Sequence, residues 1–172
     1  MKRLLPGCAV LLTTLLCALP WGMTNAAGPV ASLSATLPIT VVFACGIWWP
    51  DRLPSWIAFL CGLLTDAVTG GPLGYWALLY LLALTAARTA NALAEMPGLL
   101  IAWLAFAATA LALSLVAWLV ASMYTLEFAN WSPIAWPMGI LVVGFPVVAA
   151  VLMALSRWAE GKRPLRDAAS GQ

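Results

Sequence analysis

Residues 50–78 read PDRLPSWIAFLCGLLTDAVTGGPLGYWAL, and the order of helix breakers and apolar residues in this stretch decides the fold. An apolar run from Pro54 to Gly70 lies between a proline-bounded turn and a Gly-Gly-Pro sequence. Proline and glycine interrupt helices, so an apolar run of this length between them predicts a short helix. A second run, from Pro72 to Leu93, follows at once. The stretch therefore predicts a helical hairpin.

The composition around this hairpin is that of a membrane protein. Of 172 residues, 64% are hydrophobic and only 8% are charged, whereas soluble domains carry about 25% charged residues. So few charges cannot cover a folded protein with an ordinary polar surface. Lipid is therefore the expected solvent for most of the chain.

The apolar runs predict an all-α, polytopic bundle of about six transmembrane helices. The six predicted spans are Leu4–Met23, Val30–Trp49, Pro54–Gly70, Pro72–Leu93, Leu99–Tyr124 and Ile134–Trp158. We expect one transmembrane domain over residues 1–159 and a short polar cytoplasmic tail over residues 160–172. The third span is the shortest of the six.

The basic residues predict the orientation. With six spans, all eight fall on one side of the membrane: Lys2, Arg3, Arg52, Arg88, Arg157, Lys162, Arg163 and Arg166. Basic loops stay in the cytoplasm, so both termini are expected there. The opposite side carries only the acids Asp66 and Glu127. The N-terminal run also resembles a cleavable signal peptide, and cleavage would leave five spans.

Several classes of function lack the residues that they need. The chain has no histidine, which excludes a Ser-His pair and an HExxH zinc site. Its four cysteines lie in apolar runs without metal-ligand spacing: Cys8, Cys17, Cys45 and Cys61. The net charge of +2 is too small to indicate nucleic-acid binding. We expect no enzymatic activity, no metal and no cofactor.

Asp66 is the most informative single residue. It lies about 12 residues into the third span, or roughly 18 Å along the helix. A carboxylate near a helix C-terminus opposes the helix dipole, so another group must satisfy it. One candidate is the start of the next helix, where the amides near Gly71, Leu73 and Gly74 need acceptors. A polar contact to a partner or ligand and a proton relay are the alternatives.

Small residues share a face with Asp66. Gly62, Asp66 and Gly70 are spaced four residues apart, and Phe59 is expected to join this stripe. Faces of small residues let helices approach closely. The stripe could pack within this chain or form a docking face for a partner helix.

Two turns flank the third span. In the outer one, Gly70, Gly71 and Gly74 suit a tight bend, and Pro72 suits the first turn of the next helix. In the inner one, the turn residues are Pro50, Asp51, Arg52 and Pro54. They indicate a rigid turn with an optional Asp51–Arg52 salt bridge. Arg88, near the inner end of the fourth span, is expected to extend to the cytoplasmic surface.

The same stretch resembles the MreD family of bacterial rod shape-determining membrane proteins. The resemblance rests on the following residues: Pro50, Asp51, Pro54, Phe59, Gly62, Leu63, Leu64, Asp66, Gly70, Gly71, Pro72, Leu73, Gly74, Ala77 and Leu78. Over most of the remaining chain the agreement is weaker, and the last two spans match mainly in hydropathy. The size of the chain also fits.

The resemblance implies a role rather than a reaction. MreD proteins are components of the cell-elongation machinery in the bacterial inner membrane, where they act with the single-span protein MreC. That complex is linked to MreB filaments inside the cell and to RodA–transpeptidase peptidoglycan synthases outside. The chain would then be a non-enzymatic scaffold, with the face of Gly62, Asp66 and Gly70 as a candidate contact for an MreC-like partner.

A different class of protein also fits the hydropathy. A small-solute-binding subunit of an uptake transporter, such as the substrate-binding component of a vitamin transporter, has short-looped helices too. Its pocket could be lined by polar residues near the outer side: Thr65, Asp66, Thr69, Tyr75 and Glu127. Few other hydrogen-bonding side chains occur in the spans, and no outer loop is long enough for an obvious lid.

Overall fold

The computed structural model describes residues 5–18, 29–70, 72–94, 98–125 and 132–161. They form α1 (Leu5–Ala18), α2 (Pro29–Trp48), α3 (Ser55–Thr69), α4 (Tyr75–Ala94), α5 (Leu99–Thr125) and α6 (Ser132–Gly161). No strand occurs within these ranges. The prediction of an all-α fold is confirmed for the described chain.

Three of these helices are long and apolar enough to cross a membrane. The qualifying segments are Tyr75–Ala94, Leu99–Met123 and Ala135–Leu155. Shorter apolar segments occur in the other helices, over Gly7–Cys17, Thr36–Trp48 and Ser55–Thr69. A helix needs about 20 residues to cross the hydrocarbon layer upright. The structure thus supports the membrane character of the chain, and the count of six crossings stays a prediction.

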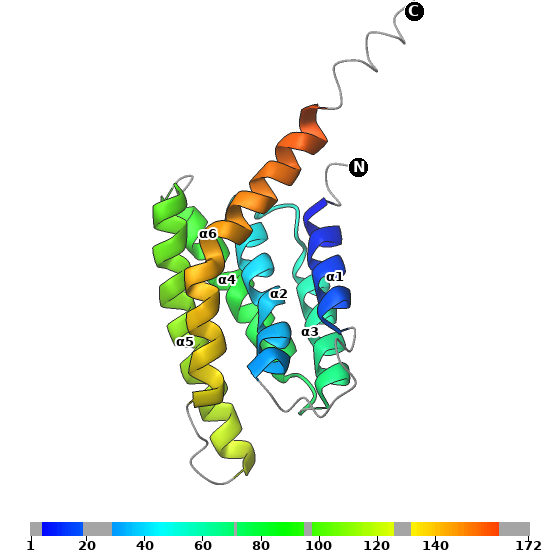
Figure 1. The fold of residues 1–172 in the computed structure, drawn as a ribbon, viewed down its shortest axis with the longest axis vertical. Helices are drawn as coiled ribbons and strands as arrows, with labels where there is room; N and C mark the ends of the chain where they lie inside the picture. Colours follow the sequence, from blue (N-terminus) through cyan, green and yellow to red (C-terminus); the bar gives the residue numbers. More distant parts are fainter. Residues whose placement is uncertain (1–4, 19–28, 71, 95–97, 126–131, 162–172) are drawn as a thin grey trace, which may run out of the picture.

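Helix α2 lies at the centre of the bundle. It contacts each of the other five helices, with α1 and α3 on one side and α5 and α6 on the other (Figure 1). Every residue from Ile39 to Ile47 is buried, whereas the helices around α2 each keep an exposed apolar side. This is the pattern expected when one helix is enclosed by protein and its neighbours face lipid.

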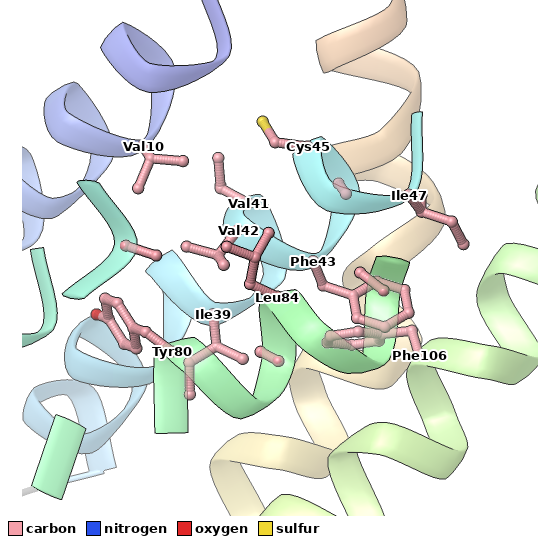
Figure 2. Close-up of a cluster of buried hydrophobic side chains, with 14 of the residues drawn as sticks. Val10, Ile39, Val41, Val42, Phe43, Cys45, Ile47, Tyr80, Leu84 and Phe106 are labelled. Carbon is pink, nitrogen blue, oxygen red and sulfur yellow. The ribbon is translucent and has the colours of Figure 1, made fainter. Parts of the chain in front are cut away.

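Aromatic side chains fill the junction of α2, α5 and α6. Phe43 of α2 points at Phe106 of α5 (Figure 2), and their ring centroids lie 5.2 Å apart at an edge-on angle. Phe106 stacks on Phe145 of α6 with a centroid distance of 4.6 Å. All three rings are fully buried. Aromatic contacts of this kind fix the α5–α6 pair against the central helix.

The helix ends and the turns between helices lie at the two ends of the bundle. Helix α1 begins and α6 ends at the same end of the molecule, and the C-terminal part of α6 leans away from the other helices (Figure 1). Helix α6 contains Pro137 and Pro146, and prolines within a helix remove hydrogen bonds and bend it. The α2–α3 turn and the α3–α4 turn lie at opposite ends of the bundle (Figure 1).

Candidate functional site

The carboxylate of Asp66 joins α3 to the beginning of α4. Its Oδ2 accepts a hydrogen bond from the backbone N–H of Gly74, and its Oδ1 accepts one from the N–H of Trp76, each 2.9 Å long. Asp66 is only 1% exposed. Because α4 begins at Tyr75, these amides belong to the helix start, where N–H groups lack partners within the helix. The prediction that Asp66 caps the second helix of the hairpin is confirmed.

The electrostatics of Asp66 differ for the two helices. The carboxylate lies near the C-terminus of α3, where it opposes the helix dipole, but at the N-terminus of α4, where the dipole favours it. Hydrogen bonds to a charged acceptor are stronger than neutral ones. Both carboxylate oxygens accept hydrogen bonds from amides at the start of α4. The interaction therefore stabilises the pair of helices, although it does not help α3 by itself.

Gly62 brings the backbones of the two helices together. A Cβ atom placed on Gly62 would lie 2.3 Å from Cα and 2.6 Å from the backbone N of Ala77. Both contacts are far shorter than real carbon contacts, and both are to backbone, which cannot move aside. Only glycine fits here, and Ala77 on the other side is also small.

The outer turn depends on glycine at two positions. Gly70 has φ +67° and ends α3, with its N–H donating to the carbonyl of Asp66 at 3.0 Å. Gly74 has φ +95°. Side chains rarely adopt these angles, so the expectation of a glycine-dependent turn is confirmed at both positions. Gly71 lies outside the described residues.

Pro72 has a different place from the one expected. The sequence predicted it in the first turn of the helix, but α4 begins three residues later, at Tyr75. The carbonyl of Pro72 accepts a hydrogen bond of 3.2 Å from the N–H of Tyr75. Because Gly74 takes a positive φ, the helix cannot extend back through it. Pro72 is thus part of the turn that leads into α4.

The stripe predicted on α3 is divided between two environments. Gly62 and Asp66 are buried against α4, which corresponds to the packing alternative for these two residues. Phe59 is 41% exposed and Gly70 lies at the exposed end of the helix, so neither joins them in the interior. The face is therefore not free as a whole to meet a partner helix.

A buried hydrogen bond adds to the contact between α3 and α4. The hydroxyls of Thr65 and Tyr80 lie 3.1 Å apart, and Tyr80 is fully buried. Thr65 also donates to the carbonyl of Cys61 at 3.0 Å. Sequence reasoning did not single out Tyr80, although a tyrosine within an apolar span needs a partner for its hydroxyl, which is a usable signal.

Arg88 of α4 binds the inner turn. Its Nη1 donates to Oγ of Ser55 at 2.9 Å, and its Nη2 donates to the carbonyls of Leu53 at 2.6 Å and Pro50 at 3.4 Å. The expectation that Arg88 extends to the cytoplasmic surface is not tested, but its side chain also has partners on the α2–α3 turn, which the sequence did not predict. The guanidinium group joins residues more than 30 positions away in the sequence.

The rest of the inner turn is only partly as expected. The N–H of Arg52 donates to the carbonyl of Trp49 at 3.0 Å, and Pro54 is the extended residue before α3. These contacts agree with a rigid turn. Within the described ranges, Asp51 forms no ion pair with Arg52, and Asp51 is exposed. The optional salt bridge is thus not formed.

Asn91 completes the contacts at the inner end. Its side-chain amide donates to the carbonyl of Ile47 in the last turn of α2. Carbonyls at a helix C-terminus lack donors within the helix, so this contact caps α2. Sequence reasoning missed Asn91, although it follows Arg88 by three residues and shares its face of α4.

The polar side chains of α3 and α4 thus satisfy backbone groups at both ends of the hairpin. Asp66 serves the start of α4, while Arg88 and Asn91 serve the inner turn and the end of α2. In the part of the chain that the structure describes, no three His, Cys, Asp or Glu side chains are grouped so as to hold a metal ion. The arrangement fixes the positions of the helices relative to one another.

No family model, curated protein or solved structure matches the chain.

Proposed function

We propose that this chain is a non-enzymatic scaffold of the bacterial cell-elongation machinery, acting in the inner membrane with an MreC-like single-span partner. In this proposal the chain crosses the membrane six times and has both termini in the cytoplasm. The link to MreB-like filaments and to RodA–transpeptidase synthases is indirect, through that partner. The proposal rests on the resemblance of residues 50–78 to MreD proteins.

One observation supports a scaffold above all others. Three motif residues fix the α3–α4 hairpin in different ways. Gly62 leaves room for the backbone of Ala77, Asp66 binds the amides at the start of α4, and Gly74 adopts a positive φ in the turn. A motif that fixes the relative position of two helices is what a scaffold needs. Its partners bind surfaces whose geometry must stay constant.

The distribution of polar groups agrees with this role. Asp66 uses both carboxylate oxygens on backbone amides, and Thr65 is bonded to Tyr80 in the interior. A solute-binding subunit needs such groups to point into a pocket, because specificity for a polar solute comes from a few convergent hydrogen-bonding side chains. Here the same groups are used within the hairpin, so the scaffold is the better supported of the two functions.

The test is a depletion experiment combined with a pull-down. Depletion of the protein in its native host is expected to turn rod-shaped cells into round ones. The tagged protein, extracted from native membranes in a mild detergent, is expected to retain a single-span coiled-coil protein and elongation synthases, identified by mass spectrometry.

A matched pair of variants makes the result specific. Gly62→Leu inserts a side chain between α3 and α4, whereas Gly139→Leu adds the same side chain where a Cβ atom meets nothing within 4 Å. At equal membrane levels, Gly62→Leu should lose partner recovery and rod shape, and Gly139→Leu should keep both. Recovery of ATPase subunits with a coupling membrane protein, and unchanged cell shape on depletion, would instead favour solute uptake.

A further inference from the structure

Two arginines from distant parts of the chain gather at the inner turn. Arg88 binds the carbonyls of Pro50 and Leu53, and these two residues flank Arg52 in the sequence. Both arginine side chains are partly exposed. The arginine turn, defined as residues 50–55 together with Arg88, thus brings two positive charges to one end of α3.

The charge of Arg88 is fixed in place but not neutralised by the groups that hold it. Its acceptors are one hydroxyl and two carbonyls, all uncharged. A guanidinium group has about five N–H donors, and three hydrogen bonds leave the others available. Among the described residues, the nearby Asp51 pairs with neither arginine. A positioned cation without a counter-ion is suited to bind an anion.

The residues beside the turn are suited to a membrane–water interface. Trp56, the residue after Ser55, is 63% exposed, and Leu60, one turn further along α3, is 51% exposed. Tryptophan prefers the level of the lipid headgroups, and an exposed leucine below it faces the acyl chains. The charged turn and this apolar strip therefore match the two parts of a lipid molecule.

We propose that the arginine turn binds the headgroup phosphate of an anionic phospholipid, with an acyl chain along the exposed side of α3 near Leu60. The N–H donors that Arg88 does not use on the turn suit phosphate oxygens, and the hydroxyl of Ser55 lies beside them as a further donor. A lipid with net negative charge is favoured over a zwitterionic one, because the ammonium of a zwitterionic headgroup adds a third cation next to Arg52 and Arg88.

The experiment compares lipids on the purified full-length protein. The protein in a neutral detergent is titrated with phosphatidylglycerol or with phosphatidylcholine of the same acyl chains, and the bound lipid is measured by native mass spectrometry. Preferential retention of phosphatidylglycerol is expected. Arg52→Gln should weaken it roughly fivefold, the effect of one basic residue at an anionic membrane surface. Arg52→Lys should restore most of the binding.

Arg157→Gln is the matched control, because it removes the same charge from α6. It should leave retention unchanged. The Arg52 side chain makes no hydrogen bond within the described residues, so its loss should not disturb the fold, which size-exclusion chromatography checks. Equal retention of both lipids, or equal losses in Arg52→Gln and Arg157→Gln, would overturn the proposal. So would displacement of the lipid by millimolar inorganic phosphate, since the site would then take free phosphate.

Discussion

The indole N–H of Trp103 in α5 donates a hydrogen bond of 2.8 Å to the carbonyl of Val142 in α6. In a regular helix this carbonyl would accept from the residue four positions later, but that residue is Pro146, which has no N–H. Trp103 therefore supplies the donor that the proline removes. A backbone carbonyl left without a partner in an apolar environment is costly, and this contact across helices avoids that cost.

The first prediction concerns this pair. Trp103→Phe keeps an aromatic ring but removes the donor, and it should lower the free energy of unfolding by about 1 kcal/mol. In a Pro146→Ala background the helix supplies its own N–H to Val142, so the same change at Trp103 should cost clearly less. The four unfolding free energies form a double-mutant cycle, measured by steric trapping in bicelles. Additive effects would mean that the two residues are independent.

The second prediction concerns close packing in the hairpin. Gly62→Ala puts a methyl group 2.3 Å from Cα of Ala77, so the helices must separate. We expect a loss of about 1–3 kcal/mol, as for overpacked cores. Gly139→Ala serves as the control because nothing lies within 4 Å of its Cβ position, and it should be neutral or slightly stabilising. Melting temperatures in detergent measure both, and equal melting temperatures for the two variants would contradict the packing described for Gly62.

The third prediction concerns the cap on α4. Asp66→Ala removes the acceptors of two amides and should destabilise the protein by about 2–6 kcal/mol, at about 1–3 kcal/mol for each unsatisfied group. Asp66→Asn keeps one oxygen and should cost less. Asp51→Ala, which removes an exposed carboxylate, should change stability by no more than about 0.5 kcal/mol. Amide hydrogen exchange at Gly74 and Trp76 gives a local readout. If these two amides are protected from exchange equally well in Asp66→Ala and in the parent chain, Asp66 does not cap α4.

The fourth prediction concerns the inner turn. Arg88→Lys keeps the charge but cannot reach Ser55 and the carbonyl of Leu53 together, because lysine lacks the planar fork of arginine. It should destabilise the protein by about 1–2 kcal/mol, nearly as much as Arg88→Gln. Limited proteolysis of the turn at residues 50–55 is the measurement, with Arg52→Lys as control. If Arg88→Lys resists protease as well as the parent chain, charge alone is what matters at this position.

Features that depend on residues close together in the sequence were predicted correctly. The short third helix, the turn glycines and the cap by Asp66 were predictable because they depend on residues within about ten positions of one another. Carboxylate and dipole arguments apply directly at that range. The start of α4 was misplaced by three residues because Pro72 is common both in a first helical turn and in the turn before it.

Contacts between distant residues were not predictable. The presence of Pro146 in α6 predicts that the carbonyl of Val142 lacks its usual helical donor. Nothing in the sequence identifies Trp103, 39 positions away from Val142, as the replacement donor. The acceptors of Arg88 were likewise missed, because they lie on a turn 33 to 38 residues earlier. Such pairings depend on how helices pack, which hydropathy and spacing do not determine.

The cap by Asp66 has a consequence for biogenesis. Its donors, the amides of Gly74 and Trp76, are synthesised eight and ten residues after the carboxylate that binds them. In the proposed six-span topology α3 enters the membrane. While only α3 has left the ribosome, Asp66 has no partner there, and its carboxylate disfavours transfer into the lipid. Helix α3 gains its partner only when α4 arrives. The two helices are therefore expected to leave the translocon together, as one inserted unit.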